Sequence, residues 1–203
     1  MRVPTPLAVR RTELGDIRCL ANTLAEAFDG YVWTDWAFPA DDRRERLRVS
    51  FELFLGATVN GLGQVWATED GHCVAVWVAP GPPTLSDSDA AALGEAYRSL
   101  LGDNAGRVET AEQAIAALRP PQPYWYLATM GTRPAHRRQG LARAVLGPVL
   151  RHCHETVTPA VLETSASDNL RLYGTLGFKA VAALDPPGAA PHVWIMVRPA
   201  PAR

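Results

Sequence analysis

The stretch that decides the fold runs from Tyr124 to Leu150 and reads YWYLATMGTRPAHRRQGLARAVLGPVL. Its first part, through Met130, is aromatic, apolar or β-branched, which is typical of a buried strand. Pro134 has no N–H to donate, so it ends the hydrogen-bond ladder of this strand. From Leu141 the apolar residues recur every three or four positions, which indicates a helix. The stretch therefore predicts a strand, a short basic turn and a helix.

The basic turn before this helix has the features of an anion site. Gly140 has no side chain, so a ligand can come close to the backbone. The first N–H groups of the helix have no partner within the helix, and the helix dipole adds positive potential there. Two arginines complete a site that suits a pyrophosphate. We expect the phosphates to bind at Arg137, Arg138, Gln139, Gly140, Leu141 and Ala142.

The overall composition is that of an ordinary globular protein. The chain has 203 residues, of which 47% are hydrophobic and 20% are charged, and its formal net charge is −1. This length predicts one domain over residues 1–203. A charge near zero provides no field that would attract nucleic acid, and no apolar run approaches a membrane span. We expect no nucleic-acid or membrane partner, and a monomer or a homodimer.

The cysteines argue against a disulfide-stabilised protein and against a cysteine-bound metal. Cys19, Cys73 and Cys153 are odd in number and scattered, and they lack the spacing of a metal site. Reduced thiols are therefore favoured over a disulfide framework. We expect a cytoplasmic protein without a metal.

The remaining patterns predict further strands and helices along the whole chain. Strands are expected at 7–11, 64–68, 72–79, 160–164, 178–184 and 192–198. Helices are expected after Thr12, over 41–58, over 86–101, after Thr110 and after Asp168. The strand at 72–79 is apolar almost throughout, so it should be covered on both faces.

An aromatic segment interrupts the pattern between the first two helices. Residues 31–38 hold four aromatic side chains and one carboxylate, and we expect a loop there. The segment suits a small-molecule acceptor pocket, although a lid over the core explains the aromatic residues about as well. In the pocket interpretation the contacts come from Tyr31, Trp33, Asp35 and Trp36.

A second motif follows the basic turn and places both motifs in a known family. Residues 137–142 fit the pattern Arg/Gln-x-x-Gly-x-Gly/Ala, and Asn169, Tyr173, Gly177 and Phe178 fit N-x-x-x-Y-x-x-x-G-F. In this order and spacing the two motifs resemble the GNAT acetyltransferase superfamily. The resemblance implies a single-domain α/β fold, with a mixed and largely antiparallel sheet that is flanked by helices and split by the acyl-CoA site.

Within this superfamily, nearly the whole chain resembles the puromycin N-acetyltransferases and their actinobacterial relatives. The resemblance rests on segments such as ELFL at 52–55, VAVW at 74–77 and LETS at 162–165. It implies an enzyme that transfers an acetyl group from acetyl-CoA, without a metal, to the primary amine of a small molecule. A puromycin-like antibiotic or a related metabolite is the expected acceptor. The chain departs from this group at Gln139 and Ala142, where glycines are common.

The resemblance also implies roles for single residues. The strand end Met130, Gly131 and Thr132 corresponds to the segment whose backbone pairs with pantetheine and polarises the thioester carbonyl. Asn169 would bind the pantetheine arm, and Tyr173 would be the general acid for the leaving thiolate.

Two further assignments stay open at this stage. Glu163 is either the general base, acting directly or through water, or a structural carboxylate paired with an arginine. Trp77 either fills the core or lines the acceptor pocket.

Two other functions also remain open. The chain could acetylate the N-terminus of a peptide or protein, or it could be a non-catalytic acyl-CoA-binding module.

Overall fold

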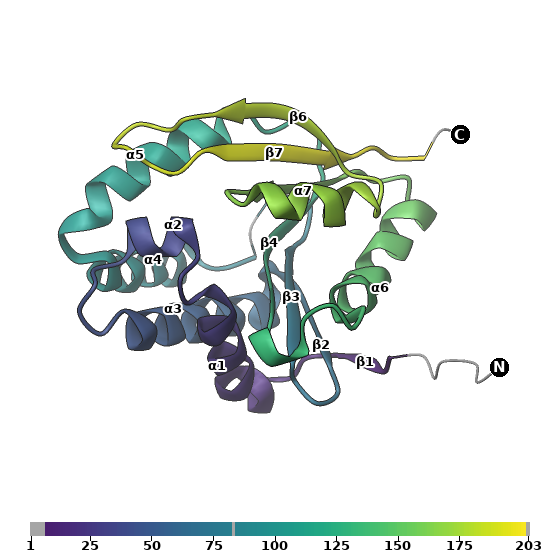
Figure 1. Ribbon diagram of the computed structural model, residues 1–203, viewed down its shortest axis with the longest axis horizontal. Helices are drawn as coiled ribbons and strands as arrows, with labels where there is room; N and C mark the ends of the chain where they lie inside the picture. Colours follow the sequence, from purple (N-terminus) through teal and green to yellow (C-terminus); the bar gives the residue numbers. More distant parts are fainter. Residues whose placement is uncertain (1–6, 83, 202–203) are drawn as a thin grey trace.

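The computed structural model describes residues 7–82 and 84–201, so both ends of the expected 1–203 domain lie outside the described residues. Its strands form one sheet in the order β1-β2-β3-β4-β5-β7-β6. The only parallel neighbours in this sheet are β4 and β5. The strands are β1 (Val9–Arg11), β2 (Gly63–Thr68), β3 (Cys73–Val78), β4 (Trp125–Thr132), β5 (Ala160–Thr164), β6 (Lys179–Leu184) and β7 (Val193–Arg198) (Figure 1).

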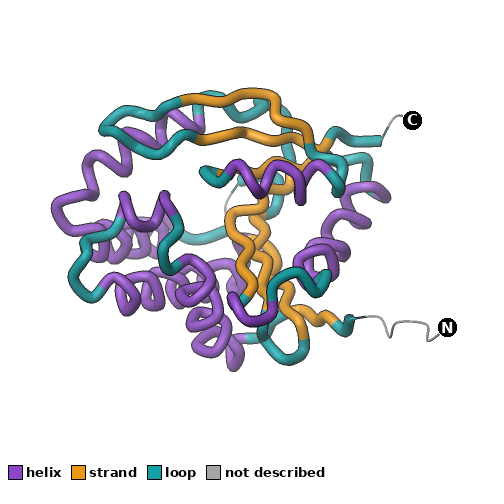
Figure 2. Tube along the Cα trace, viewed as in Figure 1, coloured by secondary structure: helices purple, strands orange, loops and turns teal. Residues whose placement is uncertain are grey.

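Helices cover this sheet on both faces (Figure 2). A single sheet built from strands along the chain confirms the single-domain α/β fold with a mixed, largely antiparallel sheet. The α-helices are α1 (Ile17–Phe28), α2 (Val32–Ala37), α3 (Arg43–Ala57), α4 (Asp87–Leu101), α5 (Ala105–Ala116), α6 (Leu141–Glu155) and α7 (Ser167–Gly174).

Strand β3 shows how the two faces are filled. Because successive side chains on a strand point to opposite faces, β3 contributes to two apolar clusters. Cys73, Ala75 and Trp77 pack with residues of α6, whereas Val74 and Val76 pack with residues of α1 and α3. All five are buried, which confirms that this strand is covered on both faces.

A third apolar cluster joins the helices that lie beyond α1. It contains Phe38, Leu47, Leu101 and Val108, which come from the segment after α2 and from α3, α4 and α5. These helices therefore form a rigid wall beside the sheet.

Local structure differs from the sequence prediction at the first helix. Thr12 does not cap it: its buried side-chain oxygen has no hydrogen-bond partner in the described part of the chain, and a 3-10 turn precedes α1, which begins at Ile17. Glu13 and Asp16 form a reciprocal capping box at that turn instead.

Two other helices also differ from the prediction. Residues 32–37 form the helix α2 rather than a loop, and α5 begins at Ala105 rather than after Thr110. Both differences reflect packing in the third cluster, since Ala37 and Val108 are buried there.

Cys19, Cys73 and Cys153 are all free thiols. Within residues 7–82 and 84–201, none of the helices has the length and apolar character that crossing a membrane requires.

Candidate active site

The centre of the sheet opens where β4 and β5 separate. These strands pair over three positions, from Trp125 opposite Ala160 to Leu127 opposite Leu162. Beyond them β5 pairs only with β7, and β4 pairs only with β3. On the side that faces away from β3, the β4 backbone after Leu127 therefore has no strand partner. Free backbone donors and acceptors at such an edge can bind an extended ligand.

An irregularity in β4 lies at the same point. Val76 of β3 stands opposite Thr129, but Trp77 stands opposite Leu127, so Ala128 is an extra residue in β4. A bulge of this kind bends its strand and increases its twist. We attribute the separation of β4 from β5 to this bend.

A cavity of about 1500 Å³ occupies this opening and extends between the helices. Its lining includes most of the residues expected to bind a ligand. They are Tyr31, Trp33, Met130, Gly131, Thr132, Arg137, Arg138, Gly140, Leu141, Ala142, Glu163, Asn169 and Tyr173. The structure thus brings together residues from five separate segments of the chain.

The start of α6 provides one end of the cavity. Gly140 precedes the helix with φ of 81°, a left-handed conformation that suits glycine. A Cβ atom at this position would meet only Leu7 Cδ1, at 3.7 Å, so the space beside the backbone is open. The first intrahelical bond runs from Ala144 N to Gly140 O, and the preceding N–H groups of the helix are free to bind an anion.

The side chains of the basic turn take different positions. Arg137 donates to Ala27 O at 3.0 Å and to Thr132 O at 3.4 Å, so it also ties the turn to α1 and β4. Arg138 lines the cavity and has a positive φ of 63°. Gln139 lies in the turn but does not line the cavity.

Gly131 permits a close approach of α1 to β4. A Cβ atom at Gly131 would lie 2.8 Å from Ala27 Cβ and 2.9 Å from Leu24 Cδ2. Any larger residue would push α1 away from the strand. Gly131 is therefore required for packing as well as being part of the cavity wall.

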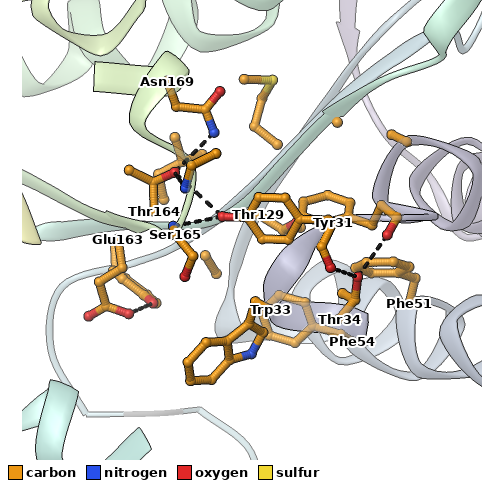
Figure 3. A pocket seen from close by; sticks show the side chains of 18 of the residues that line it. Tyr31, Trp33, Thr34, Phe51, Phe54, Thr129, Glu163, Thr164, Ser165 and Asn169 are labelled. Atoms are coloured by element: carbon orange, nitrogen blue, oxygen red, sulfur yellow. Dashed lines mark hydrogen bonds between the residues drawn. The ribbon is translucent and has the colours of Figure 1, made fainter. Parts of the chain in front are cut away.

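A hydrogen-bond network links the end of β5 to α7 and to the start of α2. Asn169 Nδ2 donates to Thr164 Oγ1 at 2.9 Å, and Ser165 N donates to the Tyr31 hydroxyl at 2.8 Å. Figure 3 shows these side chains together at the edge of the cavity. Asn169 keeps its amide oxygen for a ligand, while Tyr31 is fixed by its contact with the strand end.

Tyr173 lies on α7 and is buried, with its ring packed edge-on against Phe178. Burial raises the pKa of its hydroxyl well above the ordinary value, and nearby Tyr31 and Cys73 act in the same direction. The phenol is therefore protonated at neutral pH. It lines the cavity and can donate a proton there.

Glu163 is an ion-paired carboxylate. Arg119 Nε and Nη2 donate to its two oxygens at 2.6 and 3.1 Å, and the Tyr126 hydroxyl donates at 2.8 Å. The Arg119 guanidinium also lies 4.4 Å from the centre of the Tyr126 ring. Of the two interpretations that the sequence allowed, this geometry favours the structural carboxylate paired with an arginine.

The aromatic segment contributes Tyr31, Trp33, Thr34 and Phe38 to the cavity, and the first two of these were predicted contacts. Tyr31 and Trp33 line it, and Phe51 and Phe54 of α3 continue the same apolar wall. In Figure 3 Glu163 lies at the left, Phe51 and Phe54 lie at the right, and Trp33 lies between them at the lower centre of the view.

The other two predicted contacts, Asp35 and Trp36, do not line the cavity, which corrects the prediction. Asp35 is ion-paired with Arg43, 2.9 Å from Oδ1 to Nη1, and Trp36 Nε1 donates to Gly188 O. Asp35 follows Trp33 by two residues on the helix α2 and therefore faces away from the wall that Trp33 joins. Trp36 lies on the same side of α2 as Trp33, with 5.0 Å between the ring centroids, but its ring is held by Gly188 rather than by the cavity.

Trp77 also lies outside the cavity. It is fully buried in the apolar cluster beneath α6, on the opposite face of β3 from α1 and α3. Strand alternation places it there, since Val76 takes the α1 face. Trp77 therefore fills the core, which was the alternative that the sequence left open.

Sequence reasoning missed several residues of the cavity, notably Glu112, Arg119, Tyr126 and Thr164. One signal could have identified Tyr126. In β4 it alternates with the core residues Trp125 and Leu127, so it must point to the other face of the sheet. Glu112 and Arg119 carry no such signal, because their place depends on how α5 packs.

Comparison with known proteins agrees with this geometry. The model of the acetyltransferase (GNAT) family matches residues 29–178, well over half of the chain. The chain belongs to this family. As a GNAT acetyltransferase, it is an enzyme that transfers an acetyl group from acetyl-CoA to an amine.

Solved structures share the fold of this GNAT protein at low sequence identity. A histone acetyltransferase and related acetyltransferase from Corynebacterium glutamicum is 21% identical with a TM-score of 0.75, over 98% of this chain and 99% of that one. The polyamine N-acetyltransferase of Drosophila melanogaster is 15% identical with a TM-score of 0.60, over 94% and 98%. A mosquito arylalkylamine N-acetyltransferase-like protein is 15% identical with a TM-score of 0.55, over 95% and 99%.

The site of this GNAT protein fits acetyl-CoA in its chemistry. The free N–H groups at the start of α6 and the open space beside Gly140 suit the pyrophosphate. The unpaired edge of β4 suits the amide groups of pantetheine. Among residues 7–82 and 84–201, no group of three or more His, Cys, Asp or Glu side chains is arranged to hold a metal ion.

Proposed function

We propose that this GNAT enzyme acetylates the primary amine of a small molecule with an aromatic or apolar body, such as a puromycin-like antibiotic or a related metabolite. The observation that carries this proposal is the apolar wall of the cavity, formed by Trp33, Phe38, Phe51, Phe54 and Tyr97. Aromatic walls bind flat or apolar molecules by burying their surface.

In this proposal the cavity has two parts. The donor side comprises the start of α6, the free edge of β4 and helix α7, and it binds acetyl-CoA. The acceptor side comprises the segment from α2 to α5 together with Tyr126 and Glu163, and it binds the amine. The two sides meet where β4 and β5 separate, so the amine reaches the thioester through the opening of the sheet.

Tyr173 is the proposed general acid on the donor side. The acceptor attacks as the neutral amine, after its ammonium form has released one proton to water. The nitrogen attacks the thioester carbonyl carbon, the new C–N bond forms, and the C–S bond breaks. The leaving thiolate takes the phenol proton of Tyr173, and one proton of the amine restores the phenol. The phenol carries its proton at neutral pH, since its ordinary pKa is about 10 and burial raises it further.

The β4 backbone at Met130, Gly131 and Thr132 would pair with pantetheine, with Asn169 bound to the same arm. An N–H group held at the thioester oxygen would stabilise the charge that develops there. We assign Glu163 a supporting role, since its oxygens already accept hydrogen bonds from Arg119 and Tyr126.

An assay of thiol release from acetyl-CoA tests the proposal. The panel contains puromycin, arylalkylamines, polyamines and peptides with free N-termini, and mass spectrometry locates the added acetyl group. We expect the highest kcat/KM with amines that carry an apolar body. If only peptides are acetylated, the substrate is a protein N-terminus; if no amine accelerates thiol release, the proposal fails.

Acetylation of a protein is the second candidate function. The observation in its favour is the Corynebacterium glutamicum structure, which is described as a histone acetyltransferase and related acetyltransferase. The aromatic wall argues for a small molecule instead, because a peptide backbone needs polar partners along its length.

The proposal also covers the setting of the enzyme. Free thiols at Cys19, Cys73 and Cys153 suit the reducing cytoplasm. We propose a monomer or a homodimer whose partners are small molecules, without nucleic acid or membrane, and light scattering in solution measures the assembly state.

A further inference from the structure

Two carboxylates on the acceptor side differ in how their charge is balanced. Glu163 is bound by Arg119 and by the Tyr126 hydroxyl. Glu112 also lines the cavity, but it has no hydrogen bond or ion pair with any residue in the described part of the chain. The guanidinium of Arg119 is hydrogen-bonded to Glu163, so it acts on the charge of Glu112 only from a distance.

The position of Glu112 is fixed by the packing of α5. Val108, Ala111 and Ile115 on this helix are buried, with Val108 in the cluster that joins α2 to α5. Glu112 lies three residues after Glu109 and four before Ala116, which also line the cavity, so it is on the side of the helix that faces the cavity. The carboxylate is therefore held in the cavity wall by a rigid element.

The surroundings of Glu112 make its negative charge unfavourable. Although Glu112 is exposed to the cavity, desolvation by the protein atoms around it raises the pKa of this carboxyl above its ordinary value; Arg119 opposes the shift, and Glu163 and Glu109 add to it. The side chain is nevertheless accessible, because it faces the cavity. A positive charge placed in the cavity would stabilise the carboxylate, and the aromatic side chains around it cannot do so.

We propose that Glu112 binds the ammonium group of the acceptor, so that the enzyme selects basic alkyl amines over uncharged aryl amines. This inference rests on the proposed function and names the class of amine. The aromatic wall contacts the body of the acceptor, and Glu112 contacts its charged end. An aryl amine of the same size is uncharged at neutral pH and gains nothing from Glu112.

Calorimetry with two probes of equal size tests this assignment. The probes are 2-phenylethylamine, which is charged at pH 7, and 4-ethylaniline, which is neutral, each added to protein saturated with coenzyme A. We expect Glu112→Gln to weaken binding of 2-phenylethylamine by about 10- to 100-fold, the value of a hydrogen bond between charged groups. Binding of 4-ethylaniline should change less than about twofold, which also shows that the variant is folded.

Two further variants control for charge. Glu95→Gln removes an exposed carboxylate on α4 that does not line the cavity, and it should leave both affinities unchanged. Glu109→Gln removes a carboxylate one turn before Glu112, and it should weaken the binding of 2-phenylethylamine less than Glu112→Gln does. An equal loss in Glu109→Gln would show that the summed charge, rather than Glu112, recognises the amine.

The remaining outcomes separate this inference from the proposed function. If 2-phenylethylamine does not bind the wild type, or binds Glu112→Gln equally well, the inference is wrong whether or not other amines are acetylated. If 2-phenylethylamine binds through Glu112 but no amine accelerates thiol release, the ammonium site stands and the proposed function fails.

Discussion

The donor side and the acceptor side of the cavity are built in different ways. The proposed donor side uses backbone groups from one continuous segment, the end of β4 with the start of α6, and two side chains on α7, those of Asn169 and Tyr173. The acceptor side uses side chains that are far apart in the chain, such as Trp33, Glu112 and Tyr126. Backbone geometry tolerates sequence change, whereas a wall of side chains changes with each substitution. A common donor can therefore be kept while the acceptor varies.

The strongest test of the donor side is Tyr173→Phe. This change removes only the hydroxyl, so the packing against Phe178 should persist. We expect kcat to fall by about 10²- to 10⁴-fold, the usual contribution of a general acid. The dissociation constant for acetyl-CoA, measured by calorimetry, should not change. A kcat within about twofold of the wild type would remove Tyr173 from the proton transfer.

The second test adds a charge to the phosphate end of the donor side. Gly140→Asp places a carboxylate in open space at the start of α6, at a left-handed position that Asp and Asn tolerate better than most residues. Like charges about 4 Å apart repel by about 4 kcal/mol near a protein surface. We therefore expect acetyl-CoA affinity to drop by roughly 100- to 1000-fold.

Gly140→Asn has the same shape without the charge, and it should retain most of the affinity. Equal losses in Gly140→Asp and Gly140→Asn would mean that the backbone conformation, and not the charge, determines binding at this turn.

The third test addresses the acceptor side as a structure. Arg119→Met removes the cation that is paired with Glu163 in the cavity wall. The pair is largely buried, since 27% of the Arg119 side chain and 15% of the Glu163 side chain are exposed. Removing one partner of a buried pair is strongly destabilising, and we expect a loss of about 2–4 kcal/mol in the free energy of unfolding in urea.

The double variant Arg119→Met with Glu163→Met should recover part of this loss, since neither charge is then left alone. A single variant as stable as the wild type would mean that Glu163 does not depend on Arg119, and would reopen its role as a base.

The smallest expected effect is a change in acceptor KM that distinguishes the roles of Trp33 and Trp36. Trp33 lines the cavity, whereas Trp36 donates to Gly188 O and lies under the Arg107 guanidinium. Trp33→Ala should raise the acceptor KM about tenfold, within the range of aromatic contacts, with the KM of acetyl-CoA unchanged. Trp36→Ala should lower the melting temperature instead. The opposite pattern in steady-state kinetics would exclude α2 from the acceptor wall.

The sequence could predict the elements that form the proposed donor side because their signals are local. The strand, the turn at Gly140 and the helix α6 are adjacent in the chain, and the strand at Ala160–Thr164 was predicted with the bounds that the structure has. The acceptor side depends on packing between distant elements. Asp35 was misplaced because residues 32–37 are helical, a state that their packing with α3 to α5 imposes on a short segment.

Trp77 illustrates a different limit of the sequence. Its strand was predicted correctly, but the sequence could not show which face of the sheet Trp77 occupies. Both faces of β3 are apolar, so no polar residue distinguishes one face from the other. Glu112 shows the reverse case: a single carboxylate on a helix has no pattern, and only the fold reveals that it faces a cavity.

The short pairing between β4 and β5 has a consequence for the lifetime of the protein. Three residue pairs join the two halves of the sheet directly, so a donor that hydrogen-bonds at this opening would add to the contacts that hold them together. A ligand that binds only the folded chain raises its stability by mass action. The acetyl-CoA level in the cell would then set the fraction of chains that open and meet proteases, as well as the rate of acetylation.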